Sequence, residues 1–143
     1  MSFDLKISNG SFIFSDDGTL KKVFNEDKLR QDVIKIILTP QGTLKLHPWY
    51  GSPINERAIG KVLPANLLDT EMSSSILFAI NNLIKLQGLQ IKDGQYTTPN
   101  ELIGQVLNIS VERSIYESRQ YNIVIDILTK RGTTIRENFA LTS

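Results

Sequence analysis

The sequence predicts an α+β fold, with short N-terminal strands or a hairpin, two main helices plus one short helix, and a C-terminal antiparallel β-meander or hairpin. Apolar residues recur at helical spacing in two central stretches, and they alternate with polar residues along the last quarter of the chain. The length of 143 residues suits a single domain over residues 1–143. No repeat, linker or low-complexity tract divides it.

The N-terminal segment has the pattern of short strands joined by tight turns. Alternate positions from Phe3 to Ile7 are apolar, and Asn9-Gly10 follows. This dipeptide is a strong hairpin signal, because both residues tolerate positive φ. A second turn is predicted at residues 16–18, so we expect a hairpin or a small meander.

The first helix is predicted to begin with Asn25 as its N-cap and to end before Pro40. Glu26 and Asp27 place negative charge on the first turn, where the helix dipole favours it. Thr39 precedes a proline and is therefore biased away from helical backbone. One apolar stripe at helical spacing runs along this segment: Leu29, Val33, Ile36 and Ile37.

The second helix is predicted from near Pro64 or Thr70 to about Gln87, with Gly88 as the residue just past its end. Helical spacing places a set of apolar residues on one face, and we expect this face to enter the core. The set is Met72, Ile76, Ala79, Ile80, Leu83 and Leu86.

A third, short helix is predicted to start at Thr98. Thr98 and Glu101 have the spacing of a capping box, and Pro99 fits the first helical position. Leu102, Ile103 and Val106 fit an apolar face of this helix.

The C-terminal segment carries the clearest strand signal. From residue 107 the apolar period changes to two, which predicts strands at about 107–116, 119–130 and 134–142. Residues 130–133 form a turn, so the three strands make an antiparallel meander. The strand at 121–128 has one charge and no proline, which suits either a central strand or an edge meant to be covered.

Composition excludes several classes of function. The sequence has sixteen Lys and Arg residues and fifteen Asp and Glu residues, which gives a formal charge of +1, and it has no basic cluster. We therefore expect no nucleic-acid partner, because phosphate neutralisation needs many basic residues. The chain has no cysteine, which excludes disulfides, thiol nucleophiles and thiolate metal sites. The longest apolar run is too short to cross a bilayer, so we expect no membrane contact and see no secretory signal.

No residue pattern indicates catalysis. The only histidine, His47, lies in a loop rich in proline and aromatic residues, without a second ligand at metal spacing. Acidic residues at positions 16, 17, 26 and 27 have local roles in a turn and a helix start. Trp49 and Tyr50 suit stacking on a sugar or base, but we expect them to plug one side of the core. We therefore predict no catalytic, cofactor-binding or metal-binding residues, no cofactor, and a protein that is not an enzyme.

Two sequence segments in register carry a resemblance to a known family. The first runs from Leu29 to Gly42 and ends in Leu38-Thr39-Pro40-Gln41-Gly42. The second is His47-Pro48-Trp49-Tyr50-Gly51-Ser52-Pro53-Ile54. Together they resemble the baseplate-wedge, sheath-initiator family of contractile phage tails, also found in contractile injection and type VI secretion baseplates. That family carries an amphipathic helix, a Leu-Thr-x-x-Gly stop and a Pro-x-Tyr-Gly-Ser turn.

The resemblance implies a structural protein of the virion tail baseplate, assembled in the host cytoplasm and present in multiple copies per baseplate ring. Its expected partners are the tail sheath protein, the baseplate wedge proteins and the central hub or tube. The family's C-terminal hairpin offers an edge to which sheath arms add as strands, and this nucleates the sheath. The implied sheath-interface residues are Tyr121, Ile123, Ile125, Ile127, Ile135 and Phe139.

The resemblance is incomplete at one motif. The family often has a Glu-Pro-Arg triplet near its last helix, used at the junction with the baseplate core. The nearest equivalent here is Glu112-Arg113, which lacks the proline and falls near a predicted strand. The resemblance implies that Glu112 and Arg113 contact the baseplate core.

Three alternatives stay open at the level of sequence. The C-terminal hairpin could simply close the domain's own sheet. Some members of the family carry a lysozyme label, so a tail-associated peptidoglycan hydrolase is a second hypothesis, although no residue pattern supports it. An adaptor in a bacterial secretion baseplate is a third.

Overall fold

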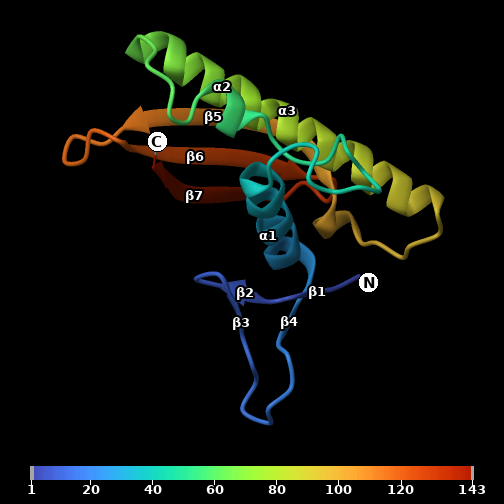
Figure 1. The fold of residues 1–143 in the computed structure, drawn as a ribbon. Helices are drawn as coiled ribbons and strands as arrows, with labels where there is room; N and C mark the ends of the chain where they lie inside the picture. The colour runs from blue at the N-terminus through green and yellow to red at the C-terminus, as the bar shows by residue number, and fades with distance from the viewer. Residues whose placement is uncertain (1, 143) are drawn as a thin grey trace.

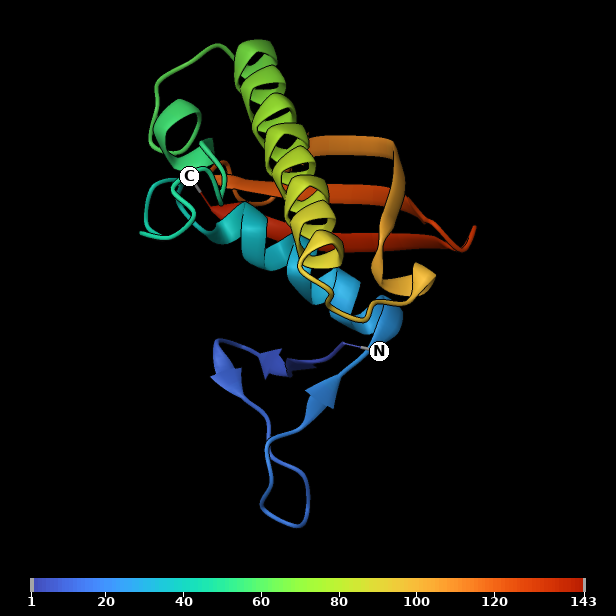
Figure 2. The same ribbon diagram turned by 90° about the vertical axis from the view of Figure 1, so that its right-hand side faces the viewer.

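The computed structural model describes residues 2–142, and they form the predicted α+β fold (Figure 1). A three-stranded antiparallel sheet is covered on one face by two helices, and an N-terminal arm extends beyond them (Figures 1 and 2). The helical elements are α1 (Asn25–Leu38), α2 (Ile54–Arg57), α3 (Ala65–Lys92) and the 3-10 turn η1 (Pro99–Glu101). The strands are β1 (Asp4–Leu5), β2 (Ile7–Ser8), β3 (Ser11–Phe12), β4 (Lys22–Val23), β5 (Ile103–Arg113), β6 (Gln120–Thr129) and β7 (Thr134–Thr142).

The N-terminal arm contains the predicted hairpin. Strands β2 and β3 pair through the turn at Asn9 and Gly10, whose φ angles of 51° and 77° are the positive values this turn needs. Outside this hairpin, β1 pairs with β4, and β4 leads the chain into α1. The loop between β3 and β4 turns at Gly18, as expected from the sequence, and projects away from the rest of the molecule (Figures 1 and 2).

Helix α1 has the predicted extent and apolar stripe, but its predicted cap is wrong. Phe24 occupies the N-cap position, and Asn25 has a φ of 52°. The Asn25 side chain instead accepts a hydrogen bond from the Thr98 hydroxyl at 3.0 Å. A partner 73 residues away in the chain therefore outweighs the local capping role.

Helix α3 continues through Gly88, so the predicted end at this residue is wrong. The helix runs to Lys92, and the chain turns at Gly94, whose φ is 84°. A glycine inside a helix costs about 1 kcal/mol relative to alanine. The helix continues despite this cost, and Leu89 and Gln90 beyond Gly88 are half-buried.

The capping box at Thr98 is confirmed, but the helix it opens is a single 3-10 turn. The backbone is already extended at Leu102, and β5 begins at Ile103 rather than near residue 107. The predicted helical face of Leu102, Ile103 and Val106 is therefore wrong. Gln87 of α3 explains the early start, because its side chain bonds the backbone of both Glu101 and Ile103.

The C-terminal meander is confirmed, with strand order β5-β6-β7. Strands β6 and β7 pair without a register shift, whereas β5 carries two irregularities, at Gly104 and Leu107. The core lies between the inner face of the sheet and helices α1 and α3. It includes Leu29, Val33, Ile36, Met72, Ile76, Ile80, Ile123, Ile125 and Ile127, each at most 1% exposed.

The structure brings the two motif segments together beside the end of α1. Ser52 donates its backbone N–H to the Thr39 carbonyl at 2.8 Å, and Gln41 donates to the Ser52 carbonyl at 3.2 Å. Gly51 lies at this crossing with a φ of 115°. A Cβ atom at this position would lie 2.5 Å from the Thr39 carbonyl oxygen. The motif therefore needs glycine at position 51 for both its backbone angle and its space.

We predict that Gly51→Ala lowers the free energy of unfolding by about 3 kcal/mol or more, because it combines backbone strain with a backbone collision. Gly42→Ala is the matched control, since Gly42 also has positive φ but has open space around the added Cβ. It should cost only about 1–2 kcal/mol. Urea unfolding of both variants checks this, and equal losses would show that space at Gly51 is unimportant.

Candidate interaction surface

The predicted sheath-interface side chains form the inner face of the sheet. Tyr121, Ile123, Ile125, Ile127 and Ile135 are at most 3% exposed and belong to the core, and Phe139 packs against it. The five buried side chains cannot contact another chain while the domain is folded, whereas Phe139 is only partly buried. Their alternation reflects packing against α1 and α3, so contact of these residues with a sheath arm would have to use the backbone, and that contact stays a prediction.

Strand β6 is central and has no free edge. Ser114 donates to the Gln120 carbonyl at one end of β6, and Thr129 donates to the Thr133 carbonyl at the other. Because bonded pairs alternate in an antiparallel ladder, even-numbered residues of β6 bond to β5 and odd-numbered residues bond to β7. A strand from another chain cannot pair with β6.

The two outer strands differ as acceptors of an added strand. The backbone groups of β7 that point away from β6 belong to residues 134, 136, 138, 140 and 142. They form a regular row along a nine-residue strand. On β5 the irregularities at Gly104 and Leu107 interrupt the row, and such bulges normally protect an edge against pairing. Strand β7 is therefore the better acceptor.

One side chain from α1 touches the free edge of β7. Arg30 Nη1 donates to the Arg136 carbonyl at 2.5 Å and to Glu137 Oε2 at 3.3 Å. Arg136 is one of the residues whose carbonyl points away from β6, so this bond occupies a position that an added strand would use. The other outward groups, at residues 138–142, have no such contact within residues 2–142.

The outer face of the sheet is polar and carries one ion pair. Asp126 and Arg136 stand opposite each other, and the guanidinium donates two hydrogen bonds to the carboxylate, at 2.7 and 3.0 Å. The hydrogen bond from Arg136 lowers the pKa of Asp126, and the same bond raises the pKa of Arg136. Charge on this face suits a surface that stays in water rather than a second core.

Glu112 and Arg113 lie at the end of β5 and therefore in a strand. Both are exposed, and Arg113 Nε donates to the Ser118 carbonyl in the loop before β6 at 2.9 Å. That loop also carries Ile115 and Tyr116, which are 88% and 93% exposed. This end of the sheet therefore presents charged and apolar groups together.

The loop of the resemblance motif contacts α3. Tyr50 packs against the core as predicted, and burial, followed by the nearby charges of Asp32 and Asp4, raises its pKa to about 12. Trp49 is not part of the core, so the prediction that it plugs one side of the core is wrong. Its carbonyl accepts from the Asn82 side chain at 2.8 Å. Its ring lies 5.4 Å from the His47 ring, and the Lys85 ammonium group lies 4.3 Å from its centroid.

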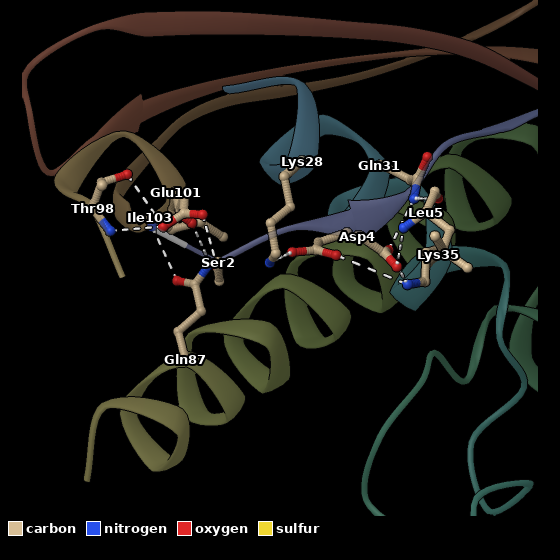
Figure 3. A network of polar contacts seen from close by, with 11 residues as sticks. Ser2, Asp4, Leu5, Lys28, Gln31, Lys35, Gln87, Thr98, Glu101 and Ile103 are labelled. Carbon is tan, nitrogen blue, oxygen red and sulfur yellow. Dashed lines mark hydrogen bonds and ion pairs between the residues drawn. The ribbon is translucent and has the colours of Figure 1, made fainter. Parts of the chain in front are cut away.

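A buried polar network joins the start of the chain to α3 and β5 (Figure 3). Glu101 accepts hydrogen bonds from Ser2 Oγ at 2.7 Å and from the Thr98 backbone at 2.6 Å. Gln87 donates to the Glu101 carbonyl and accepts from the Ile103 N–H, at 2.9 and 3.0 Å. Sequence analysis missed Gln87, because a polar residue on an apolar helix face gives no hint of its partner.

A second polar cluster holds strand β1 against α1 (Figure 3). Lys35 lies 2.6 Å from Asp4 and 4.0 Å from Asp32, and Lys28 lies 2.6 Å from Asp32. Burial raises the pKa of Asp32 despite its two lysine neighbours. Burial also opposes ionisation of Asp4, but hydrogen bonds from Lys35 and Gln31 outweigh it and hold the pKa of Asp4 below its ordinary value of 3.8.

Among residues 2–142, no three His, Cys, Asp or Glu side chains are grouped so that they could hold a metal ion. No helix in this part of the chain combines the length and the apolar character needed to cross a membrane.

We predict that Asp4→Asn destabilises the protein at neutral pH and that this loss disappears in acid. The lowered pKa of Asp4 means that its stabilisation is present above pH 3.8, its value in the unfolded chain, and is lost as pH falls through the folded value. Urea unfolding of both proteins between pH 2.5 and 7 measures the difference. Asp16→Asn, at the exposed tip of the arm, is the control, and a pH-independent difference for Asp4→Asn would contradict the assignment.

Comparison with known proteins supports the fold. No protein-family model matches the sequence, and no curated protein is significantly similar to it. The crystal structure of a "putative tail lysozyme" from Geobacter sulfurreducens matches this structure with a TM-score of 0.59. The match covers 92% of this chain and 96% of that one, at 13% sequence identity. The α+β architecture is therefore shared with that protein over most of both chains.

Proposed function

We propose that this protein is a structural, non-enzymatic component of a contractile-tail baseplate that nucleates sheath assembly. In this proposal a sheath arm adds as a strand to the free edge of β7. The observation that carries it is the regular row of outward backbone groups on β7, beside a central strand that is already fully paired. The motif resemblance, and the fold shared with a protein named as a putative tail lysozyme, support the same setting.

The free energy of strand addition suits a sheath that assembles only on a template. Each added backbone hydrogen bond contributes about 0.5–1.5 kcal/mol net, so a short run gives several kcal/mol. Association itself costs about 4–15 kcal/mol. A single added strand should therefore bind weakly but measurably in free solution, whereas several initiators held in one baseplate ring would bind a sheath ring tightly.

We also propose that the β5 side of the sheet, at the end that carries the loop before β6, meets the baseplate. Glu112 and Arg113 are exposed there, close to Ile115 and Tyr116 in the loop before β6. A mixed apolar and charged surface of this kind suits a protein interface with the wedge proteins or the central hub. The proposed location is the virion tail baseplate, in multiple copies per ring.

A peptidoglycan hydrolase is the second candidate, and one observation favours it. Asp4 and Asp32 both contact Lys35, and their pKa values move in opposite directions, which is the pattern of an acid and base pair. Against this, each carboxylate already has a lysine partner. The cavity beside them holds about 210 Å³, below the roughly 300 Å³ at which ligand pockets usually begin. The cluster is better explained as a structural junction.

We predict that the purified protein does not clear a peptidoglycan suspension in a turbidity assay. Asp32→Asn is the matched variant, because it removes one member of the carboxylate pair. Clearing by the natural protein that is lost in Asp32→Asn would establish the hydrolase in place of the structural proposal.

We predict that Ala140→Pro abolishes seeding of the cognate sheath subunit, measured by electron microscopy and sedimentation. The Ala140 N–H points away from β6, so proline removes only an edge donor and leaves the β6–β7 ladder intact. Ala140→Ser keeps the N–H and should seed normally. Proline on the central strand, as in Ile125→Pro, would disrupt the core and cannot serve as this test.

Thermal unfolding of both Ala140 variants serves as the folding control. Normal seeding by a folded Ala140→Pro protein would overturn strand addition at β7.

A further inference from the structure

The free edge of β7 is not uniform along its length. Its outward carbonyl at Arg136 is already bonded to Arg30, whereas residues 138–142 are open. Arg30 lies on α1, which crosses β7 in Figures 1 and 2. Its neighbour Leu29 and, one turn further on, Val33 are fully buried, so the helix holds the guanidinium at this point of the edge.

Displacing Arg30 from the edge would be costly. A charged donor makes a stronger hydrogen bond to a carbonyl than a backbone N–H does. The same nitrogen also pairs with Glu137, whose side chain is only 17% exposed. A strand that paired with Arg136 would have to break the first bond and leave this half-buried carboxylate without its partner. Pairing should therefore stop at Arg30 and cover residues 138–142, about 17 Å of strand.

Arg30 also has hydrogen-bond donors that these two bonds do not use. Both of its bonds use Nη1, and within residues 2–142 neither Nε nor Nη2 has an acceptor. Guanidinium binds carboxylates in a two-pronged geometry, so a carboxylate at the end of the added strand would fit. Strand β7 runs from Thr134 to Thr142, so an antiparallel strand would begin near Thr142 and finish beside Arg30. A parallel strand would bring its amino end to the same cation.

We propose that Arg30 is the residue that sets the register and direction of strand addition at β7, by stopping the added strand and binding its C-terminal carboxylate. The inference rests on the proposed function, since it concerns the same edge. It specifies the partner as an extended C-terminal segment of about five residues that runs antiparallel to β7 and ends in a free carboxylate.

The experiment uses a synthetic peptide of the last fifteen residues of the cognate sheath subunit, labelled at its amino end. It is made with either a free C-terminal carboxylate or a carboxamide, and binding is measured by fluorescence polarisation. We expect the carboxylate form to bind the natural protein about tenfold more tightly. In Arg30→Met, which keeps the aliphatic stem, the two forms should bind within about twofold of each other.

A second variant serves as a control for folding and tests the register of the added strand. Arg30→Met combined with Glu137→Gln removes the uncompensated carboxylate and should unfold at a temperature close to that of the natural protein. Hydrogen exchange with the carboxylate peptide bound should show protection at residues 138–142 in the natural protein. In the double variant this protection should extend to residues 134 and 136.

The outcomes separate this inference from the proposed function. Equal affinity of the two peptides, or no peptide binding at all, while full-length sheath seeding still depends on Ala140, overturns the role of Arg30 and leaves strand addition standing. Peptide binding and sheath seeding that are both insensitive to Ala140→Pro overturn both. A carboxylate preference that survives in Arg30→Met also overturns the role of Arg30.

Discussion

The rest of this structure depends on burial of one face of β6 beneath two helices. Ile123, Ile125 and Ile127 are at most 1% exposed, and α1 and α3 cover them with their own apolar stripes. A strand buried this completely needs all its backbone groups paired, which requires neighbours on both sides. The central position of β6, the order of the sheet and the one-sided helical layer all follow from this requirement.

This burial also decides where another protein can bind. The inner face of the sheet is occupied, and the outer face carries the Asp126–Arg136 ion pair in water. The surfaces that remain are the backbone along the two edges and the loop that follows Arg113. The two edges are unequal, because bulges interrupt β5 whereas β7 is regular. The proposed strand addition at β7 is therefore a consequence of how the core is built, and α1 both covers the core and reaches that edge.

Local chemistry explains which elements were predictable. The Asn9-Gly10 hairpin, the Thr98 capping box and the alternation in β6 and β7 each rest on residues close together in the chain, and all three are confirmed. The predictions that were wrong failed because of contacts with residues far away in the chain. Asn25 bonds to Thr98 instead of capping its own helix, and Gln87 starts β5 four residues early by bonding the backbone near Ile103. No local pattern announces a partner many residues away.

By itself the sequence determined the kinds of element, most of their limits, and which residues are apolar enough to be buried. It also showed that Tyr121 to Ile127 alternate, but alternation is the same for a buried face and for a binding face. Only the tertiary structure decided between them, because strand order depends on pairing across the chain. It made β6 central, left β7 with a free edge, and placed Arg30 on that edge. The physical reason is that periodicity is a local property, whereas an edge exists only once the whole sheet has formed.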